Sequence, residues 1–200
     1  MIILKFLYIL ILKILSVIKR NYRRLKYFIL PNIFTKATYS YRSFPDFQQK
    51  TIISGKGILR IGERCGFGYK IGGFWRNGSI EIQPRRKGAT IKIGNSVHTN
   101  NNIFICALKY ISIGDNTRIG QNVCIMDFEA HNTNPLERSK VGEIGIIEIA
   151  ENVWIGNNVT ILKNSKIGKN SIVATGAVVN GSFPDNVIIG GIPAKIIKTL

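Results

Sequence analysis

A six-residue period dominates the second half of this sequence. Counting by six from Ile113, with one gap, every frame position is a β-branched aliphatic: Ile113, Ile119, Ile125, Ile149, Ile155, Ile161, Ile167, Val173 and Val179. In seven of these hexads the fourth position is Asn or Gly, which tolerate left-handed backbone geometry: Asn116, Asn122, Asn152, Asn158, Asn164, Asn170 and Gly176. An α-helix would instead repeat about every 3.6 residues. The pattern predicts a solenoid of short parallel strands, whose coils bury their apolar faces only against neighbouring coils.

The period continues more loosely towards the N-terminus. Aliphatic pairs mark these earlier coils: Leu59/Ile61, Ile80/Ile82, Ile91/Ile93, Ile103/Ile105 and Ile111/Ile113. We therefore expect an all-β solenoid over residues 51–187. An apolar and basic helix is expected at residues 1–28, a connector or cap at 29–50, and a short C-terminal tail at 188–200.

The gap in the frame predicts a loop that leaves the solenoid. Ile125 and Ile149 are 24 positions apart, a multiple of six, so counting alone does not reveal a break. Continued coils would turn three polar side chains inward: His131, Glu137 and Glu143. Burying such groups without partners is costly. We therefore expect residues 127–146 to form an extruded loop, and loops on a rigid scaffold often carry function.

The N-terminal segment combines apolar and basic character. Residues 1–18 are strongly apolar, although Lys5 and Lys13 interrupt the run, and the basic run KRNYRRLKYF follows. The formal net charge of +17 favours anionic partners. Three interpretations remain open: a helix lying on an anionic membrane surface, a single span, or a helix packed against a partner subunit. No nucleic-acid-binding motif accompanies the charge, so nucleic acid is not an expected partner.

The chain has three widely spaced cysteines, Cys65, Cys106 and Cys124. Their spacing indicates neither a disulfide framework nor a metal-binding pattern. Three reduced thiols in packed positions are expected, which fits a reducing compartment.

The hexads, the His-bearing loop, NVWIG at 152–156 and IIGGIPAKII at 188–197 together resemble the hexapeptide acyltransferases. The similarity is closest to the branch with galactoside, maltose and nodulation O-acetyltransferases and those of surface-polysaccharide clusters. It implies a left-handed parallel β-helix that works as a homotrimer, with acetyl-CoA as co-substrate between adjacent solenoids. Carbonic anhydrases of this fold need three zinc histidines, whereas this chain has only His98 and His131, so no metal is expected.

The resemblance also implies roles for individual residues. His131 falls at the family's general base, and Asp127 and Glu129 are both candidates to orient its ring. Asn102, with Asn101 as its neighbouring alternative, falls where related enzymes stabilise the oxyanion or bind acceptor. His98 is expected to be structural or to line the acceptor site. The residues expected to contact acetyl-CoA are Trp154, Asn157, Thr175, Asn180, Lys195 and Lys198.

The expected function is therefore O-acetylation of a sugar hydroxyl, in surface-polysaccharide biosynthesis. The acceptor is expected to be a lipid- or nucleotide-linked saccharide. From the apolar and basic start we expect the enzyme to lie in the cytoplasm, peripheral to the inner face of the plasma membrane. Two alternatives are N-acetylation of an amino-sugar nucleotide and a non-catalytic binding protein built on the solenoid.

Overall fold

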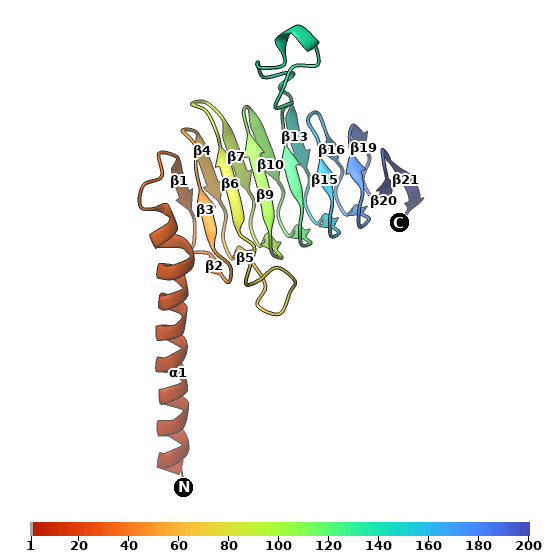
Figure 1. The fold of residues 1–200 in the computed structure, drawn as a ribbon. Coiled ribbons are helices and arrows are strands. Elements are labelled where there is room, and N and C mark those ends of the chain that lie inside the picture. Colours follow the sequence, from red (N-terminus) through yellow and green to blue (C-terminus); the bar gives the residue numbers. More distant parts are fainter. Residues whose placement is uncertain (1) are drawn as a thin grey trace.

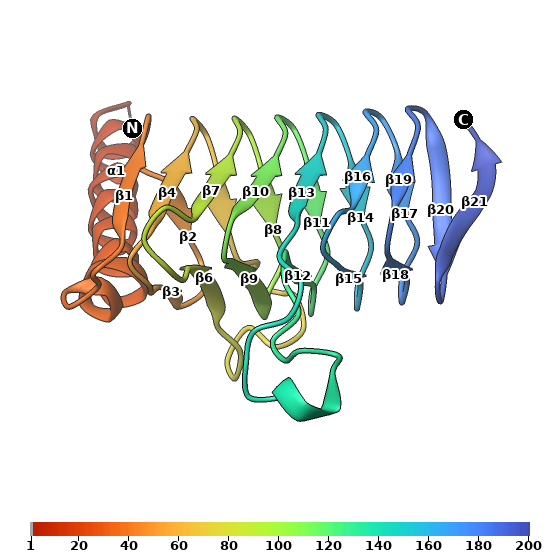
Figure 2. The same cartoon turned by 90° about the horizontal axis from the view of Figure 1, so that it is seen from above.

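The computed structural model describes residues 2–200 and shows a solenoid of parallel strands with a long helix at its N-terminal end (Figure 1). The expected left-handed parallel β-helix is confirmed. Each coil contributes one strand to each of three sheets, and coils follow one another along the axis from α1 to β21 (Figure 2). The last strand, β21, runs antiparallel to its neighbour, β20.

The three sheets are here called A, B and C. Sheet A contains β1 (Thr38–Tyr41), β4 (Ile58–Ile61), β7 (Thr90–Ile93), β10 (Tyr110–Ile113), β13 (Ile146–Ile149), β16 (Lys166–Ile167) and β19 (Ser182–Phe183). Sheet B contains β2 (Asp46–Phe47), β5 (Gly66–Phe67), β8 (His98–Thr99), β11 (Arg118–Ile119), β14 (Trp154–Ile155), β17 (Ile172–Val173), β20 (Val187–Gly191) and β21 (Ala194–Thr199). Sheet C contains β3 (Thr51–Ile53), β6 (Ile80–Pro84), β9 (Ile103–Ala107), β12 (Cys124–Met126), β15 (Thr160–Ile161) and β18 (Val178–Val179).

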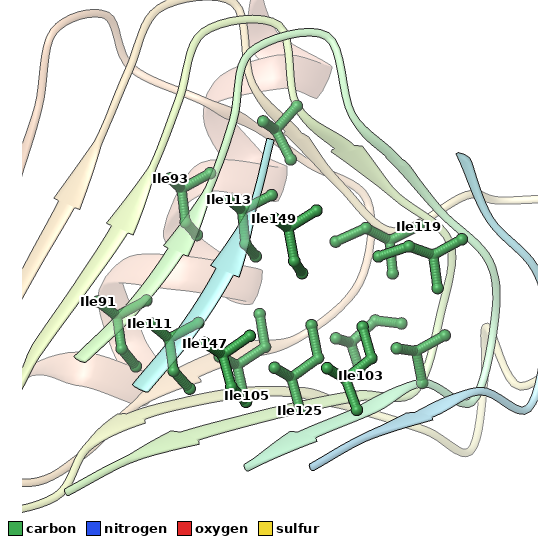
Figure 3. Close-up of a cluster of buried hydrophobic side chains, with 14 of the residues drawn as sticks. Ile91, Ile93, Ile103, Ile105, Ile111, Ile113, Ile119, Ile125, Ile147 and Ile149 are labelled. Atoms are coloured by element: carbon green, nitrogen blue, oxygen red, sulfur yellow. The ribbon is translucent and has the colours of Figure 1, made fainter. Parts of the chain in front are cut away.

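The inward positions predicted from the hexads form the core. All nine frame residues are at most 3% exposed, and in seven of the hexads the fifth position is buried as well: Thr117, Val123, Val153, Val159, Ser165, Ser171 and Ala177. Figure 3 shows side chains of successive coils stacked on one another, such as Ile91, Ile111 and Ile147. Because each inward aliphatic contacts its equivalents above and below, the coils support one another along the axis.

Asparagines with positive φ turn the chain at the corners of the coils. The asparagines predicted at the fourth hexad position have φ between 56° and 61°. Their side chains also bond from coil to coil, since Asn102 donates to Asn122 and Asn122 donates to Asn158. The sequence pattern therefore has two causes, backbone geometry and a ladder of amide hydrogen bonds.

Asn170 offers a test of this double role. Its φ is 58°, and its amide accepts from Asn152 at 3.0 Å and donates to Asn186 at 2.8 Å. Replacement by alanine is expected to lower the free energy of unfolding by about 1–2 kcal/mol, because alanine is strained at positive φ and the ladder is broken. Asn170→Gly, which removes only the ladder, should lose less. Urea denaturation measures both, and equal losses would contradict the contribution of strain.

The solenoid starts earlier than residue 51. β1 pairs in parallel with β4, and β2 with β5, so residues from Thr38 onward already form the first coil. At the other end, β20 and β21 form a hairpin that extends sheet B, in the segment expected as a tail.

The N-terminal helix α1 spans Ile2–Arg24 and leads through a π-helical turn (Leu25–Ile29) and a 3-10 turn (Leu30–Asn32) into the first coil. Phe28 plugs the open end of the solenoid by stacking on Phe47, with ring centroids 4.2 Å apart. The buried Asn32 ties this plug to β3 by donating to the backbone carbonyl of Thr51 at 2.8 Å. The junction between helix and solenoid is therefore packed and hydrogen-bonded.

Beyond this junction, α1 extends away from the first coil (Figure 1). Its apolar side chains are exposed from Leu7 to Ile18. Within residues 2–200 no helix combines the length and apolar character that crossing a bilayer would require.

The three cysteines are free thiols, as expected. Cys65 and Cys106 are buried and Cys124 is partly buried. Burial raises the pKa of each thiol, that of Cys106 to about 11, which keeps them protonated and unreactive at neutral pH.

Candidate functional site

Sheet B presents a file of outward-facing residues along the whole solenoid. Strand side chains alternate in direction, so the residue preceding each inward aliphatic points outward. The strand registers place these residues in one line, from the first coil to the last strand: Asp46, Gly66, His98, Arg118, Trp154, Ile172, Ile188 and Lys198. The regular repeat thus brings together residues distant in sequence.

A cleft of about 530 Å³ lies over the middle of this file. Its walls include His98, Asn100, Arg118, Trp154 and Asn157. Trp154 is 58% exposed, although burial is usual for so large an apolar residue. An open aromatic surface flanked by polar groups suits a ligand.

The structure brings together some of the residues predicted to bind acetyl-CoA. Trp154 and Asn157 line the same cleft, and Thr175 follows at the same corner one coil later. A Cβ atom on Gly156 would lie 2.7 Å from the Thr175 backbone nitrogen, so glycine is needed for this close approach.

The other predicted donor contacts lie apart from this cleft. Asn180 follows β18 at the corner between sheets C and A, on the side of the 127–146 loop. Lys195 and Lys198 are exposed on β21, the last strand of sheet B. Lys198 nevertheless belongs to the outward file that contains Trp154.

His98 is held in the cleft by Arg118. An Arg118 Nη1 lies 2.6 Å from His98 Nδ1. The same Nδ1 lies 3.0 Å from the backbone carbonyl oxygen of Ser96, to which Arg118 Nη1 also donates at 2.7 Å. His98 is thus fixed in the wall of the cleft, and the acceptor-lining role expected for it remains a prediction.

The extruded loop is present where the frame fails. The chain leaves sheet C after β12, forms a 3-10 turn at Pro135–Glu137 and returns to sheet A at β13. Its two arms pair as an antiparallel ribbon, through Glu129 N to Glu143 O at 2.9 Å and Asn132 N to Lys140 O at 2.8 Å. In Figure 1 the loop projects well beyond the solenoid.

His131 is exposed on this loop with a defined orientation. Its Nδ1 lies 2.7 Å from the backbone carbonyl oxygen of Arg138. A carbonyl can only accept, so Nδ1 carries the proton and Nε2 presents a free lone pair. This is the arrangement that a general base requires, and a backbone group of the loop's return arm provides it.

Neither carboxylate considered for orienting His131 does so. Asp127 is fully buried and accepts from the backbone N–H groups of Leu108, Lys109 and Tyr110 at 2.7–2.8 Å. Glu129 instead forms an ion pair with Lys163 at 3.3 Å. Both residues hold the base of the loop on the solenoid.

Lys163 links the loop to the next coil. Its Nζ is 2.8 Å from Glu143 and 3.3 Å from Glu129, one residue on each arm of the ribbon. The Lys163 hydrogen bond lowers the pKa of Glu143 below its ordinary value. A lowered carboxyl pKa means that this link is complete at neutral pH and is lost only as acid protonates Glu143.

Within one chain His131 does not meet the other predicted site residues. It lies on a loop between sheets C and A, whereas the cleft with Trp154 lies on sheet B. Asn102 lies at a third place, the corner between sheets B and C, where its amide donates to Asn122 at 2.9 Å. The oxyanion role predicted for Asn102 remains a prediction.

The neighbouring asparagines take different positions. Asn101 is completely buried and fixes the backbone of Tyr69 and Gly73. Asn100 lines the cleft beside His98 and Trp154. Sequence reasoning missed Asn100, although strand alternation after the inward-facing Thr99 would have pointed to it.

A second loop, residues 68–79 between β5 and β6, was also missed. Asn101 and Gln49 hold it, and the indole of Trp75 donates to the Gln48 carbonyl at 2.6 Å. Tyr69, at its start, lines the cleft. Its glycine-rich sequence was the available signal, but the loose frame of this region hid the insertion.

Part of the chain, residues 147–181, matches the bacterial transferase hexapeptide (six repeats) family. WbbJ of Escherichia coli K12, provisionally named a lipopolysaccharide biosynthesis O-acetyl transferase, is 30% identical over 160 residues, or 73% of this chain and 74% of WbbJ. Galactoside O-acetyltransferase of the same strain is 35% identical over 115 residues, which span 56% of each protein.

Two solved structures share the architecture. The polySia specific acetyltransferase NeuO superposes with a TM-score of 0.58 at 21% identity, over 82% of this chain and 77% of NeuO. AntD, a Bacillus cereus N-acyltransferase in complex with dTDP and 3-hydroxybutyryl-CoA, gives 0.57 at 19% identity, over 80% of this chain and 82% of AntD. At this identity the superpositions show a common fold.

Proposed function

The chain belongs to the hexapeptide-repeat acyltransferases, and from this premise we propose that it transfers acetyl groups from acetyl-CoA to a sugar hydroxyl in surface-polysaccharide biosynthesis. The observation that carries the proposal is the geometry of His131, whose Nδ1–H is bound by a backbone carbonyl while Nε2 stays free. The names of WbbJ and galactoside O-acetyltransferase support a saccharide hydroxyl as the acceptor.

The loop that carries His131 connects sheets C and A, whereas the cleft lies on sheet B. We therefore propose that His131 serves the cleft of a neighbouring copy and that a second chain completes the site. A homotrimer, the expected assembly, would place the loop of each chain over sheet B of the next. Each active site would then combine His131 of one chain with Trp154, Asn157 and His98 of another.

In the proposed reaction, His131 Nε2 removes the proton of the acceptor hydroxyl as its oxygen attacks the thioester carbonyl. A base of this kind contributes about 10²–10⁴-fold to the rate. Hydrogen-bond donors in the cleft stabilise the oxyanion of the tetrahedral intermediate. The intermediate then expels the thiolate of coenzyme A, which takes the proton from the imidazolium, and no acyl-enzyme forms.

The test is an assay of coenzyme A release with acetyl-CoA and a panel of saccharides, with mass spectrometry of the products. Transfer of one acetyl group to a hydroxyl is the expected result. Turnover confined to amino sugars would move the assignment to N-acetylation. Absence of acetyl transfer with every acceptor would overturn the proposal in favour of a binding protein.

Replacement of Trp154 by alanine is expected to raise KM for acetyl-CoA about tenfold with little change in kcat. The exposed indole supplies apolar contact area to the donor, and a tenfold change corresponds to ~1.4 kcal/mol. Steady-state kinetics check this. Phe34→Ala, which removes a 93% exposed aromatic from outside the cleft, is the matched control and should leave KM unchanged. An unchanged KM in Trp154→Ala would remove the predicted donor role.

The N-terminal helix supports a location at the cytoplasmic face of the plasma membrane. Its exposed apolar residues, from Leu7 to Ile18, precede a basic cluster that suits anionic headgroups. A lipid-linked saccharide would meet acetyl-CoA at this surface. Deletion of residues 1–24 should abolish binding to anionic vesicles, and unaltered vesicle binding would contradict this location.

A further inference from the structure

A second basic cavity lies where α1 joins the solenoid. It measures about 460 Å³, and its walls include four arginines of the described chain, Arg20, Arg23, Arg24 and Arg64, together with the carboxylate of Asp46. Three of the arginines come from the last turns of α1, and the fourth precedes β5 in the second coil. The fold therefore concentrates positive charge from two distant segments.

Contacts within the protein satisfy only part of the hydrogen-bonding capacity of these arginines. Asp46, the acidic residue among the described walls, already accepts from Arg23 at 3.1 Å. The guanidinium of Arg24 lies 4.3 Å above the ring of Phe44. The Nε atoms of Arg23 and Arg24 are buried and have no hydrogen-bond partner within residues 2–200. Such groups require an acceptor, since an unpaired buried donor is costly.

The guanidinium groups that line this cavity suit a phosphate ligand. Guanidinium groups pair with phosphate oxygens in a planar, bidentate way, and several arginines around one cavity suit more than one phosphate. One neutralised carboxylate among four guanidiniums leaves an excess of positive charge. A neutral saccharide would satisfy none of it.

The arginine cavity adjoins the cleft of sheet B. Asp46 and His98 line both cavities. In sheet B, β14 with Trp154 is separated from β2 with Asp46 by four strand spacings, which is about 19 Å. Lys195 and Lys198, the cations predicted for the phosphates of coenzyme A, lie at the opposite edge of the sheet. The arginines are therefore available to the acceptor.

We propose that this arginine cavity binds a diphosphate group that links the saccharide acceptor to its carrier. The inference rests on the proposed function and specifies the substrate class, a saccharide diphosphate. The carrier is an isoprenoid lipid or a nucleoside, because both present the same diphosphate. The reacting sugar then extends from the arginines along sheet B towards Trp154.

Binding of three probes to the full chain, measured by calorimetry with coenzyme A saturating, tests the proposal: inorganic pyrophosphate, farnesyl diphosphate and uridine diphosphate. Each should bind, and Arg20→Gln/Arg24→Gln should weaken each about tenfold or more. Stronger binding of farnesyl diphosphate would identify a lipid carrier, and stronger binding of uridine diphosphate a nucleoside carrier. Saturating coenzyme A excludes the donor site as the origin of the signal.

Lys13→Gln/Lys19→Gln is the matched control, because it removes the same charge from the same helix outside the cavity. It should bind pyrophosphate as the parent does. The single variant Arg20→Gln controls for misfolding of the double variant. It should weaken binding of the probes, but by less than the double variant does. Equal binding in parent and Arg20→Gln/Arg24→Gln, or an equal loss in the lysine control, would overturn the proposal.

If the proposed function is wrong, the result differs from the one that would overturn the diphosphate site. In that case no acceptor is acetylated, while pyrophosphate binding still reports on the cavity. If acetyl transfer occurs, pyrophosphate should inhibit competitively against a saccharide diphosphate. Competition against acetyl-CoA only would assign the arginines to the donor and overturn the inference.

Discussion

Replacement of His131 by alanine is expected to lower kcat for acetyl transfer by about 10²–10⁴-fold. The reason is local: Arg138 O lies 2.7 Å from Nδ1 and holds the proton there, so the Nε2 lone pair is free to accept, and the loop carries no second imidazole. KM for acetyl-CoA should change little, because no predicted donor contact lies on this loop. Steady-state kinetics with purified protein, at saturating acceptor, measure both constants.

Two comparisons make this result specific to the imidazole. Thr133→Ala changes an exposed neighbour on the same loop and should keep the parent rate. The thermal midpoint of His131→Ala should equal that of the parent, because His131 is exposed and its loop is anchored elsewhere. An unchanged kcat would remove His131 as the base.

The solenoid could be predicted because its physical constraint repeats at a fixed spacing. Ile119 and Val153 are buried since every coil needs small or branched apolar groups at the same two places. Asparagine recurs at the corners, as at Asn158, because the backbone turns left-handed there. The loop could be predicted for the converse reason, since His131 occupies a place where burial would be costly.

The details of the site have no such repeated signal. A backbone carbonyl orients His131, and a carbonyl is present at every residue, so the sequence pointed to Asp127 and Glu129 instead. The first coil was missed because β1, with the sequence TYSY, carries exposed and half-buried polar residues in place of the aliphatic pair. The arginine cavity depends on how α1 joins the solenoid, a matter of tertiary packing.

Replacement of Asp127 by asparagine is expected to reduce the free energy of unfolding by about 3 kcal/mol or more. Asp127 is fully buried, and its two oxygens accept from three backbone N–H groups at 2.7–2.8 Å. An amide presents its own donor to at least one of them, which leaves buried donors unpaired. For a chain of this size such a loss corresponds to about 6–12 °C in Tm. Differential scanning calorimetry measures it.

The same substitution should also lower kcat, because Asp127 is where the loop of His131 leaves the solenoid and Phe128 packs beside it against Leu108. This separates Asp127→Asn from His131→Ala, which should lose activity with its Tm intact. Asp185→Asn is the matched control: Asp185 is exposed and accepts one backbone N–H, that of Lys169, which an amide oxygen can still serve. Its free energy of unfolding should change by less than about 0.5 kcal/mol. Equal stabilities of Asp127→Asn and Asp185→Asn would show that the buried carboxylate does not anchor the loop.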